Sequence, residues 1–568
     1  MRDTSHTRPS VRRMLVGVSW FCAALTHAAP EDGGLDLLLV NAQVYTPDGW
    51  MQAMAVRDGL IVALGSNAAV EKLVEHGTEV LDLKQQAVFP GLHDSHVHPM
   101  FAGLEQNSCG FPAGASRQII TAAVAECANR AQAGEWIVGG NWVGAVFGEG
   151  EQNSTFLDAV APDNPVALTD EAHHSLWVNS RALLLAGISA DTPDPQGGRI
   201  DRDAQGEPTG VLRESAERLV RAVIPAPSLN VRRQALVWAS QEMLSYGITS
   251  YTVASVRRGD LEPLSALSAE GLIRQRVRGC IVWSPPGNEL SALSEQLIEK
   301  RHRYAQPRFR PDCVKIFMDG VPTESHTGAM LQPYEGTAER GMLLIPQAVL
   351  EEAVARFDRQ GLHIKFHAAG DGAVRAAIDA VAAARARNGF GGPIHHVGHS
   401  TFVDSADIPR AITAQLGWEF SPYIWYPTPM AAVDVRRAVG DERMRRWVPI
   451  RDAIDTGALV VVGSDWSVVP SVNPWLAMET LVTRQMPGGS ERALGENQRI
   501  TLREAFELFT GNGARMMGHR NEVGSLEPGM RADFFVTRTN PFDVPITSLH
   551  EMRITSTWID GEQVYSAQ

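Results

Sequence analysis

Cysteine, aromatic residues and long apolar runs are all scarce in this sequence. It has five cysteines in 568 residues, its aromatic content is 7%, and 51 basic residues face 65 acidic ones, for a formal charge of −14. No apolar run reaches the ~20 residues of a membrane-spanning helix, which excludes a multi-pass membrane protein. The acidic balance argues against nucleic acid as the main partner, because binding phosphates needs a basic face. A hydrophobic content of 44% is ample for a folded core, so wholesale disorder is also excluded.

The few cysteines carry little information. No two of them form a C-x-x-C pair, so the sequence does not favour a cysteine zinc cluster. A disulfide between Cys109 and Cys127 is conceivable in an oxidising compartment. Free buried cysteines are the interpretation we favour from the sequence alone.

Residues 1–28 have the pattern of an export signal. Arginines precede an uncharged segment, residues 14–25, and small residues follow up to Ala28, where we place the cleavage. The pair Arg12-Arg13 leaves the twin-arginine route open beside the general secretory route. A membrane anchor or a misassigned start is the alternative. We expect an exported protein, periplasmic or secreted, without a membrane segment after processing.

Both ends of the mature chain are rich in short β-type runs. Apolar and polar residues alternate over residues 35–88, and the pattern returns over residues 510–568. Asp58-Gly59 and Asp560-Gly561 interrupt such runs, and Asp-Gly in that position is typical of a tight hairpin because glycine accepts positive φ. We expect the two ends to combine into one small β-sandwich domain.

The middle of the chain, residues 89–509, alternates apolar β-type runs with helical segments such as Val349–Gln360 and Ala373–Arg387. Eight alternating units predict an α/β fold, a (β/α)₈ TIM-like barrel. The segment of about residues 100–240 is too long for one crossover, so it predicts an insertion that caps the active-site face. We expect helices in it near Ala115–Ala133 and Leu229–Tyr246. The predicted barrel strands are Ala87–His98, Gly247–Ser255, Ile273–Trp283, Cys313–Gly320, His363–Gly370, Pro393–Thr401, Ala414–Tyr423 and Leu459–Ser467.

Histidines gather at the ends of several of these predicted strands. His96 and His98 end the first one, and their spacing of two puts both side chains on one face, able to hold a single cation. Lys315 lies in an otherwise apolar strand, where an unpaired ammonium is costly. His367 and Asp465 close two further strands. The carboxyl ends of barrel strands are where barrel enzymes place their chemistry, so these residues predict a metal-dependent active site.

The chain resembles the amidohydrolase superfamily, and in particular the long branch that includes N-substituted formamide deformylase. The resemblance covers essentially the whole mature chain. It rests on the segments 90–98 (PGLHDSHVH), 314–320 (VKIFMDG), 463–465 (GSD), 524–533 (GSLEPGMRAD), 174–183 and 197–206.

The resemblance implies two divalent metal ions, usually zinc. His96, His98 and Asp465 would hold one ion, and His367 and His399 the other. Lys315 would be carboxylated by CO₂ and bridge them, which converts a buried cation into an anionic ligand. Paired ions activate water as hydroxide and polarise a carbonyl, and the catalytic Asp465 would pass the water's proton to the leaving nitrogen.

One motif departs from the family pattern. Members commonly carry Glu-His at the sixth strand, whereas this chain has Gly398-His399. The ligand choice among His395, His396 and His399 therefore stays open, with His399 preferred for the spacing of the residues that follow it. Further pocket residues that we consider for substrate contact are His174, Trp177 and His326.

We therefore expect a hydrolase of an amide-type C–N bond other than a peptide bond, in an amide, N-substituted formamide or carbamate. Aromatic residues near loops and strand ends favour an aryl or alkyl amide as the small-molecule substrate. The alternatives are hydrolysis of a lactone or cyclic imide, or a non-catalytic regulatory or binding protein on the same barrel. Homo-oligomers are common in the family, and no residue pattern here requires one.

Overall fold

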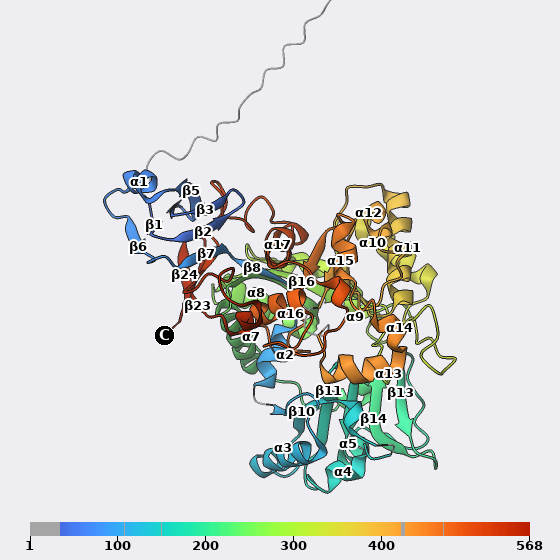
Figure 1. Ribbon diagram of the computed structural model, residues 1–568. Helices are drawn as coiled ribbons and strands as arrows, with labels where there is room; N and C mark the ends of the chain where they lie inside the picture. Colours follow the sequence, from blue (N-terminus) through green and yellow to red (C-terminus); the bar gives the residue numbers. More distant parts are fainter. Residues whose placement is uncertain (1–34, 107, 149, 422–425, 470, 568) are drawn as a thin grey trace, which may run out of the picture.

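A parallel eight-stranded barrel forms the centre of the computed structural model (Figure 1), which describes residues 35–106, 108–148, 150–421, 426–469 and 471–567. The strands run in the order β21-β20-β19-β18-β17-β16-β15-β8, and a parallel bridge between Val97 and Trp466 joins the two ends of the sheet. The predicted barrel fold is confirmed. The strands are β8 (Leu92–Val97), β15 (Ile248–Val256), β16 (Arg276–Val282), β17 (Phe309–Phe317), β18 (His363–Ala368), β19 (His395–His399), β20 (Leu416–Phe420) and β21 (Val460–Val462).

Each of these strands overlaps one of the eight predicted runs, because a strand buried on both faces reads as a continuous apolar segment. The first predicted run, Ala87–His98, proved to be two strands. Its first part, β7 (Ala87–Pro90), belongs to another sheet, and β8 starts the barrel after Gly91. A Cβ on Gly91 would lie 2.1 Å from Thr249 Oγ1, so only glycine fits this junction between the sheets.

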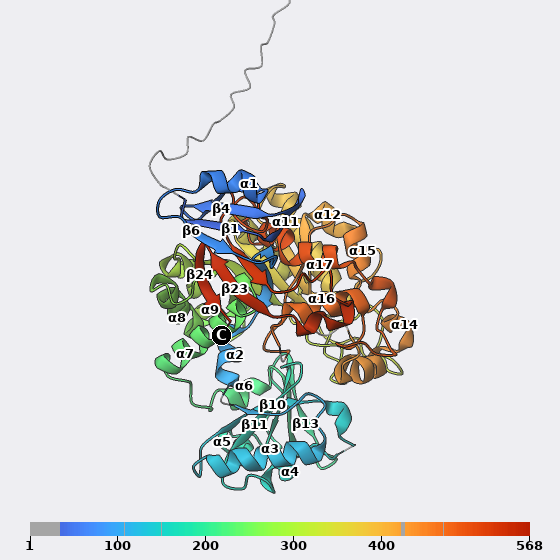
Figure 2. The same cartoon turned by 60° about the vertical axis from the view of Figure 1, so that its left-hand side comes forward.

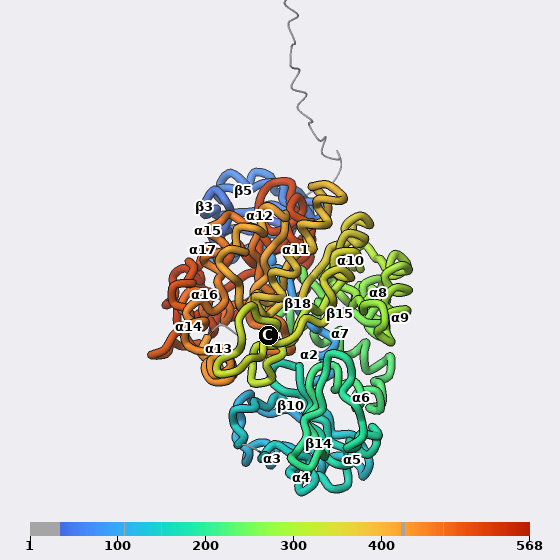
Figure 3. The backbone as a smooth tube through the Cα atoms, turned by 90° about the vertical axis from the view of Figure 1, so that its right-hand side faces the viewer, coloured from blue at the N-terminus to red at the C-terminus, as the bar shows by residue number. Residues whose placement is uncertain are grey.

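Helices cover the outside of the barrel (Figure 3). The predicted helical segments Val349–Gln360 and Ala373–Arg387 correspond to α10 and α11, which pack side by side. The predicted insertion helix near Leu229–Tyr246 is α7, which packs on α2 and contributes buried residues to the barrel core. The helices are α2 (Pro99–Glu105), α7 (Leu229–Leu244), α8 (Arg258–Ala269), α9 (Ser291–Lys300), α10 (Gln347–Arg359), α11 (Asp371–Asn388), α12 (Arg410–Ala414), α15 (Ile450–Asp455), α16 (Pro474–Thr483), α17 (Leu502–Phe509) and α18 (Gly511–Met516).

The two ends of the described chain share one sheet. Strand β22 (Phe534–Thr537) pairs antiparallel with β7, in the six-stranded order β24-β23-β22-β7-β2-β3. A second sheet, β5-β4-β1-β6, is built from residues 37–82 alone. Asp58-Gly59 and Asp560-Gly561 both form hairpin turns in which both residues have positive φ, as Asp-Gly turns require. The remaining strands are β1 (Leu37–Val40), β2 (Gln43–Thr46), β3 (Gly49–Met51), β4 (Ala53–Arg57), β5 (Leu60–Gly65), β6 (Glu79–Asp82), β23 (Ile554–Ile559) and β24 (Glu562–Ser566).

The insertion is built on a sheet that the sequence reading missed. Its six strands run in the order β13-β14-β12-β11-β10-β9 and enclose hydrophobic clusters separate from the barrel core. Figure 2 shows the insertion and the terminal sheets at opposite ends of the barrel. Its elements are β9 (Cys109–Gly110), α3 (Arg117–Arg130), β10 (Ile137–Trp142), α4 (Ser154–Asp158), β11 (Val166–Asp170), β12 (Ser175–Val178), α5 (Ser180–Leu185), β13 (Gly198–Arg202), β14 (Pro208–Glu214) and α6 (Glu217–Arg221).

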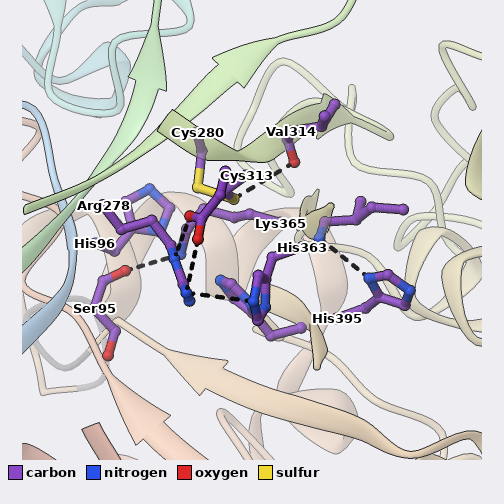
Figure 4. The surroundings of a disulfide bond; sticks show 12 residues. Ser95, His96, Arg278, Cys280, Cys313, Val314, His363, Lys365 and His395 are labelled. Carbon is purple, nitrogen blue, oxygen red and sulfur yellow. Dashed lines mark hydrogen bonds and ion pairs between the residues drawn. A yellow bond between two sulfur atoms is a disulfide. The ribbon is translucent and has the colours of Figure 1, made fainter. Parts of the chain in front are cut away.

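The described cysteines are paired, which corrects the expectation of free thiols. Cys109 and Cys127 join β9 to α3 with a Cα–Cα distance of 5.9 Å, and this is the pair that the sequence left open. Cys280 and Cys313 join neighbouring barrel strands with a Cα–Cα distance of 4.2 Å (Figure 4).

The predicted signal segment, residues 1–28, lies outside the described residues. Among the helices that are described, none has the length and apolar character needed to cross a bilayer.

Candidate metal centre

The carboxyl ends of the barrel strands bring the predicted ligands to one face of the barrel. His96 and His98 lie at the end of β8, Lys315 near the end of β17, and His367 in β18. His399 ends β19 and Asp465 follows β21, and the side chains of His96, Lys315, His367, His399 and Asp465 are all buried. Parallel strands of a barrel present these ends to the same mouth, so residues more than 350 positions apart meet there.

Asp465 is the centre of this group. Its Oδ1 lies 3.2 Å from His98 Nε2 and 3.4 Å from His96 Nε2, and its Oδ2 lies 3.5 Å from His399 Nδ1. One ligand atom each from His96, His399 and Asp465 fall within 4.8 Å of one another. Burial alone would raise the pKa of Asp465, but His96 and His399 hold it far below its usual range, so this carboxyl is an anion.

His96 is oriented by a residue that the sequence reading missed, Glu419 of β20. The His96 Nδ1 donates to Glu419 Oε1, which leaves His96 Nε2 facing Asp465. That Nε2 is buried and has no hydrogen-bond partner among the described residues. A histidine that gives one nitrogen to a carboxylate and keeps the other free is the usual arrangement of a metal ligand.

Glu419 also binds Lys365 and His396 inside the barrel. Lys365 Nζ donates to Glu419 Oε2 and, at 2.9 Å, to the backbone oxygen of Ser95, while His396 Nε2 lies 3.2 Å from Glu419 (Figure 4 shows Ser95, His96 and Lys365 together). Burial would raise the pKa of Glu419, but Lys365 and His96 hold it well below its ordinary value. Charged residues within the apolar strands 363–368 and 416–420 were the sequence signal for this cluster.

Lys315 is buried without a carboxylate partner. Among the described residues no carboxylate oxygen lies within 4.0 Å of its Nζ, which lies 4.9 Å from the centroid of the Phe317 ring. Burial, helped by the charge of Lys365, lowers the pKa of Lys315 to about 7. A large fraction of this amine is therefore uncharged at neutral pH.

His367 lies on the far side of His399 from His96 and His98. The ring centroids of His367 and His399 are 4.5 Å apart, and His367 Nε2 lies 3.1 Å from the backbone oxygen of Gly320. The ring of His174, from the insertion, is 5.1 Å from that of His367. His399 thus stands between Asp465 and His367.

Of the three sixth-strand histidines, His399 is the one that lies beside Asp465. His395 Nε2 lies 3.0 Å from Asp358, on the helix side, and His396 faces Glu419. His399 has φ of 69°, which ends the strand alternation and turns its ring toward Asp465. A Cβ on Gly398 would lie 3.0 Å from Glu419 Oε1, so Glu419 occupies the space beside Gly398.

Of the three residues considered for substrate contact, only His174 lies at the site. Its Nδ1 is 2.8 Å from Glu214 Oε2. Burial would lower the pKa of His174, but Glu214 raises it to about 9, so the ring is a cation at neutral pH.

The other two residues have local partners. Trp177 is fully buried in the core of the insertion, and its indole donates to the backbone oxygen of Asn153. His326 stacks on Tyr334 with 4.3 Å between ring centroids and lies 2.9 Å from Glu339. Both side chains are used by local packing and pairing, which motif position alone does not reveal.

A barrel with histidines and an aspartate gathered at the strand ends defines the class of metal-dependent barrel enzymes. The chain belongs to the amidohydrolase family, whose sequence profile matches residues 79–565. The family resemblance is therefore confirmed, and with it the coarse expectation of a hydrolase of a metal-dependent superfamily that acts on small molecules. The nitrogen and oxygen donors of His96, His399 and Asp465, with the free Nε2 of His96, fit such a metal centre.

Individual relatives cover nearly the whole chain. N-substituted formamide deformylase of Arthrobacter pascens is 27% identical over 547 residues, 93% of this chain and 97% of that protein. Protein LONG AFTER FAR-RED 3 of Arabidopsis thaliana is 29% identical over 545 residues, covering 93% and 91%. The crystal structure of an uncharacterized metal-dependent hydrolase from Pyrococcus horikoshii has the same fold, with a TM-score of 0.70 at 22% identity over 90% of this chain and 99% of that one.

Glu419→Gln tests how far the buried carboxylate supports the metal centre. The amide keeps the size of the side chain but removes the charge that orients His96, so we expect metal affinity to fall by about 10–100-fold. Metal content after equilibration with chelator-buffered zinc measures this.

The matched control is Glu479→Gln. Glu479 is also fully buried and lies 2.7 Å from a histidine, His550, but belongs to the outer helix α16. Equal loss of metal in the two variants would show that burial of a charge, and not the contact with His96, decides the affinity.

Proposed function

We propose that this protein hydrolyses an amide-type C–N bond, in an amide, an N-substituted formamide or a carbamate. The observation that carries the proposal is the buried carboxylate of Asp465, with three histidines at 3.2–3.5 Å, at the mouth of the barrel. The similarity to N-substituted formamide deformylase over 93% of the chain supports this choice of bond.

Two divalent ions, with zinc as the first candidate, would be held by His96, His98, His367, His399 and Asp465. Imidazole and carboxylate donors suit zinc. When bound, such ions polarise a carbonyl and lower the pKa of water.

Lys315 would bridge the ions as a carbamate. The nucleophile that attacks CO₂ is the uncharged amine, and a pKa of about 7 provides it at neutral pH. The attack forms an N–C bond and releases one proton, which gives an anionic oxygen ligand in place of a buried cation. Two dications would offset its charge.

The residues of this chain divide the proton transfers between them. Asp465, held as an anion, accepts the proton of the attacking water and gives it to the leaving nitrogen. His174, held as a cation by Glu214, is placed beside His367 to donate a hydrogen bond to the substrate oxygen as negative charge develops there.

An apolar hollow beside His98 supports an aryl or alkyl group on the substrate. Ser255 and Asp260 also line it, and the apolar part of its wall consists of Met100, Phe101, Leu236, Val253 and Leu264. Binding of a hydrocarbon group against such an apolar wall is favourable.

The purified, zinc-loaded protein should hydrolyse members of a library of alkyl and aryl formamides, amides and carbamates, and lose activity on chelation. Lys315→Ala should abolish turnover because the bridging ligand is lost, and short carboxylic acids should restore part of it. The measurement is amine release. Undiminished turnover in Lys315→Ala would contradict the bridge. Hydrolysis of lactones or cyclic imides alone would replace the proposed bond, and no hydrolysis with bound metal would favour the non-catalytic alternative.

The pH dependence of kcat tests the role of His174. Because its pKa is raised to about 9, the cation persists at neutral pH and is lost as pH rises through about 9, so kcat should fall there. His174→Gln should lower kcat by about 100-fold and remove this limb of the profile. An exposed histidine, His76, changed to Gln is the control, and an unchanged alkaline limb in His174→Gln would contradict the assignment.

We also propose that the protein is exported. The disulfides Cys109–Cys127 and Cys280–Cys313 support an oxidising compartment for the mature chain. The periplasmic fraction of an expressing cell should contain protein that begins at Ala29, as measured by N-terminal sequencing. Full-length protein with reduced thiols in the cytoplasm would contradict export.

A further inference from the structure

An acidic pocket lies where the insertion meets the barrel loops. It is lined from the insertion by Asp170 and Glu171, and from the barrel side by Glu324 and Asp434. Asp434 belongs to η5 (Met430–Val435), between β20 and β21. None of these four carboxylates belongs to the metal centre.

Two of the four carboxylates are already satisfied. Asp170 Oδ1 accepts hydrogen bonds of 2.8 Å from the backbone nitrogens of His174 and Ser175. Glu324 Oε1 lies 3.0 Å from Arg213 Nη1. These contacts account for half of the negative charge in the wall.

Glu171 and Asp434 each keep one carboxylate oxygen without such a partner, although the backbone N–H of Ala145 donates to Asp434. Glu171 Oε2 and Asp434 Oδ1 are buried and have no hydrogen-bond partner among the described residues. Asp434 is only 3% exposed, and no ion pair within 4.0 Å joins it or Glu171 to a described cation, although the charge of Arg437 acts on Asp434. Unpaired buried carboxylates are costly, so this wall is complementary to a cation that the chain itself does not supply.

The pKa values of these groups show the same imbalance. Burial raises the pKa of Glu171 to about 7, and burial together with the charge of Glu324 raises that of Asp434 to about 7. A cation placed between them would favour the ionised forms.

The chemistry of the wall favours an organic cation over a metal ion. Trp142, Val143, Ala172 and Met430 lie among the carboxylates. In the part of the chain that the structure describes, three or more ligand atoms converge within 4.8 Å only at Asp465, so the pocket carboxylates form no chelating cage. An ammonium on a hydrocarbon chain matches both the acids and the apolar surface.

The pocket shares a turn with the proposed reaction site. The segment 171–174 connects β11 to β12, with Glu171 in the pocket wall at one end and His174 at the other. The His174 ring lies 5.1 Å from that of His367, so a molecule spanning this turn would reach from the pocket to the metal centre.

We propose that the acidic pocket binds a primary ammonium group of the substrate, which is then an amide carrying an amine at the end remote from the bond that is cut. This inference rests on the proposed C–N hydrolysis for its reaction, but the pocket's affinity for a cation is independent of it.

The test compares N-(aminoalkyl)formamides with N-alkylformamides of equal length, over chains of three to eight carbons, on the zinc-loaded protein. At the chain length that spans the turn, the amine should raise kcat/KM at least about tenfold. Glu171→Gln and Asp434→Asn should each remove most of this advantage through KM and leave hydrolysis of the alkylformamide as in the wild type.

The matched control is Glu126→Gln, an exposed acid on α3 of the insertion, which should keep the full advantage. Equal kcat/KM for the two substrate series in the wild type would overturn the inference and leave the proposed hydrolase intact. The wild-type comparison of the two substrate series tests the inference even where a variant fails to fold.

Calorimetry with hexylammonium chloride separates the pocket from the reaction. The wild type should bind hexylammonium and not hexanol, and Glu171→Gln and Asp434→Asn should weaken binding about tenfold. If no formamide is hydrolysed, the proposed function fails, but the calorimetry still shows whether the acidic pocket binds an ammonium group. Absence of hexylammonium binding would overturn the ammonium assignment. The assignment would also be overturned if potassium chloride or calcium chloride displaced hexylammonium better than other salts do at equal ionic strength.

Discussion

One fully buried carboxylate, that of Glu419, holds together the inner layer of the barrel on which the metal centre rests. It contacts His96 from β8, Lys365 from β18 and His396 from β19. A buried anion is tolerated only when such partners satisfy it, and removing one partner of a buried pair costs about 3–5 kcal/mol. The orientation of His96, and so the position of its free Nε2 beside Asp465, depends on this contact.

The same contact explains the departure at the sixth strand. A side chain at Gly398 would point at Glu419 Oε1, with 3.0 Å between that oxygen and the added Cβ. The carboxylate of this layer comes from β20 and lies beside Gly398. His399 then reaches the site through its positive φ and not through strand alternation.

The barrel was predictable because its strands are buried on both faces and so appear as apolar runs, several of which end in a residue able to bind metal. His96 and His98 also shared a spacing that fixes their common face. Glu419 was missed because its partners come from three strands, and no local pattern reports such a meeting. The insertion sheet was missed because its strands are short, with glycines in β10 that close backbone contacts require. Trp177 resembled a pocket residue by motif, yet the hidden sheet buries it.

In the proposed function, the insertion rather than the barrel would separate one substrate from another. The barrel residues proposed to hold metal would serve any scissile C–N bond. The turn 171–174 instead sets two groups of opposite charge on one short segment: His174, made a cation by Glu214, and Glu171, without a partner in the described chain. A substrate of the proposed kind would place a developing negative oxygen at one end and a cation at the other. Charge complementarity of this kind excludes wrong substrates by leaving a buried group unpaired, which costs more than a lost apolar contact.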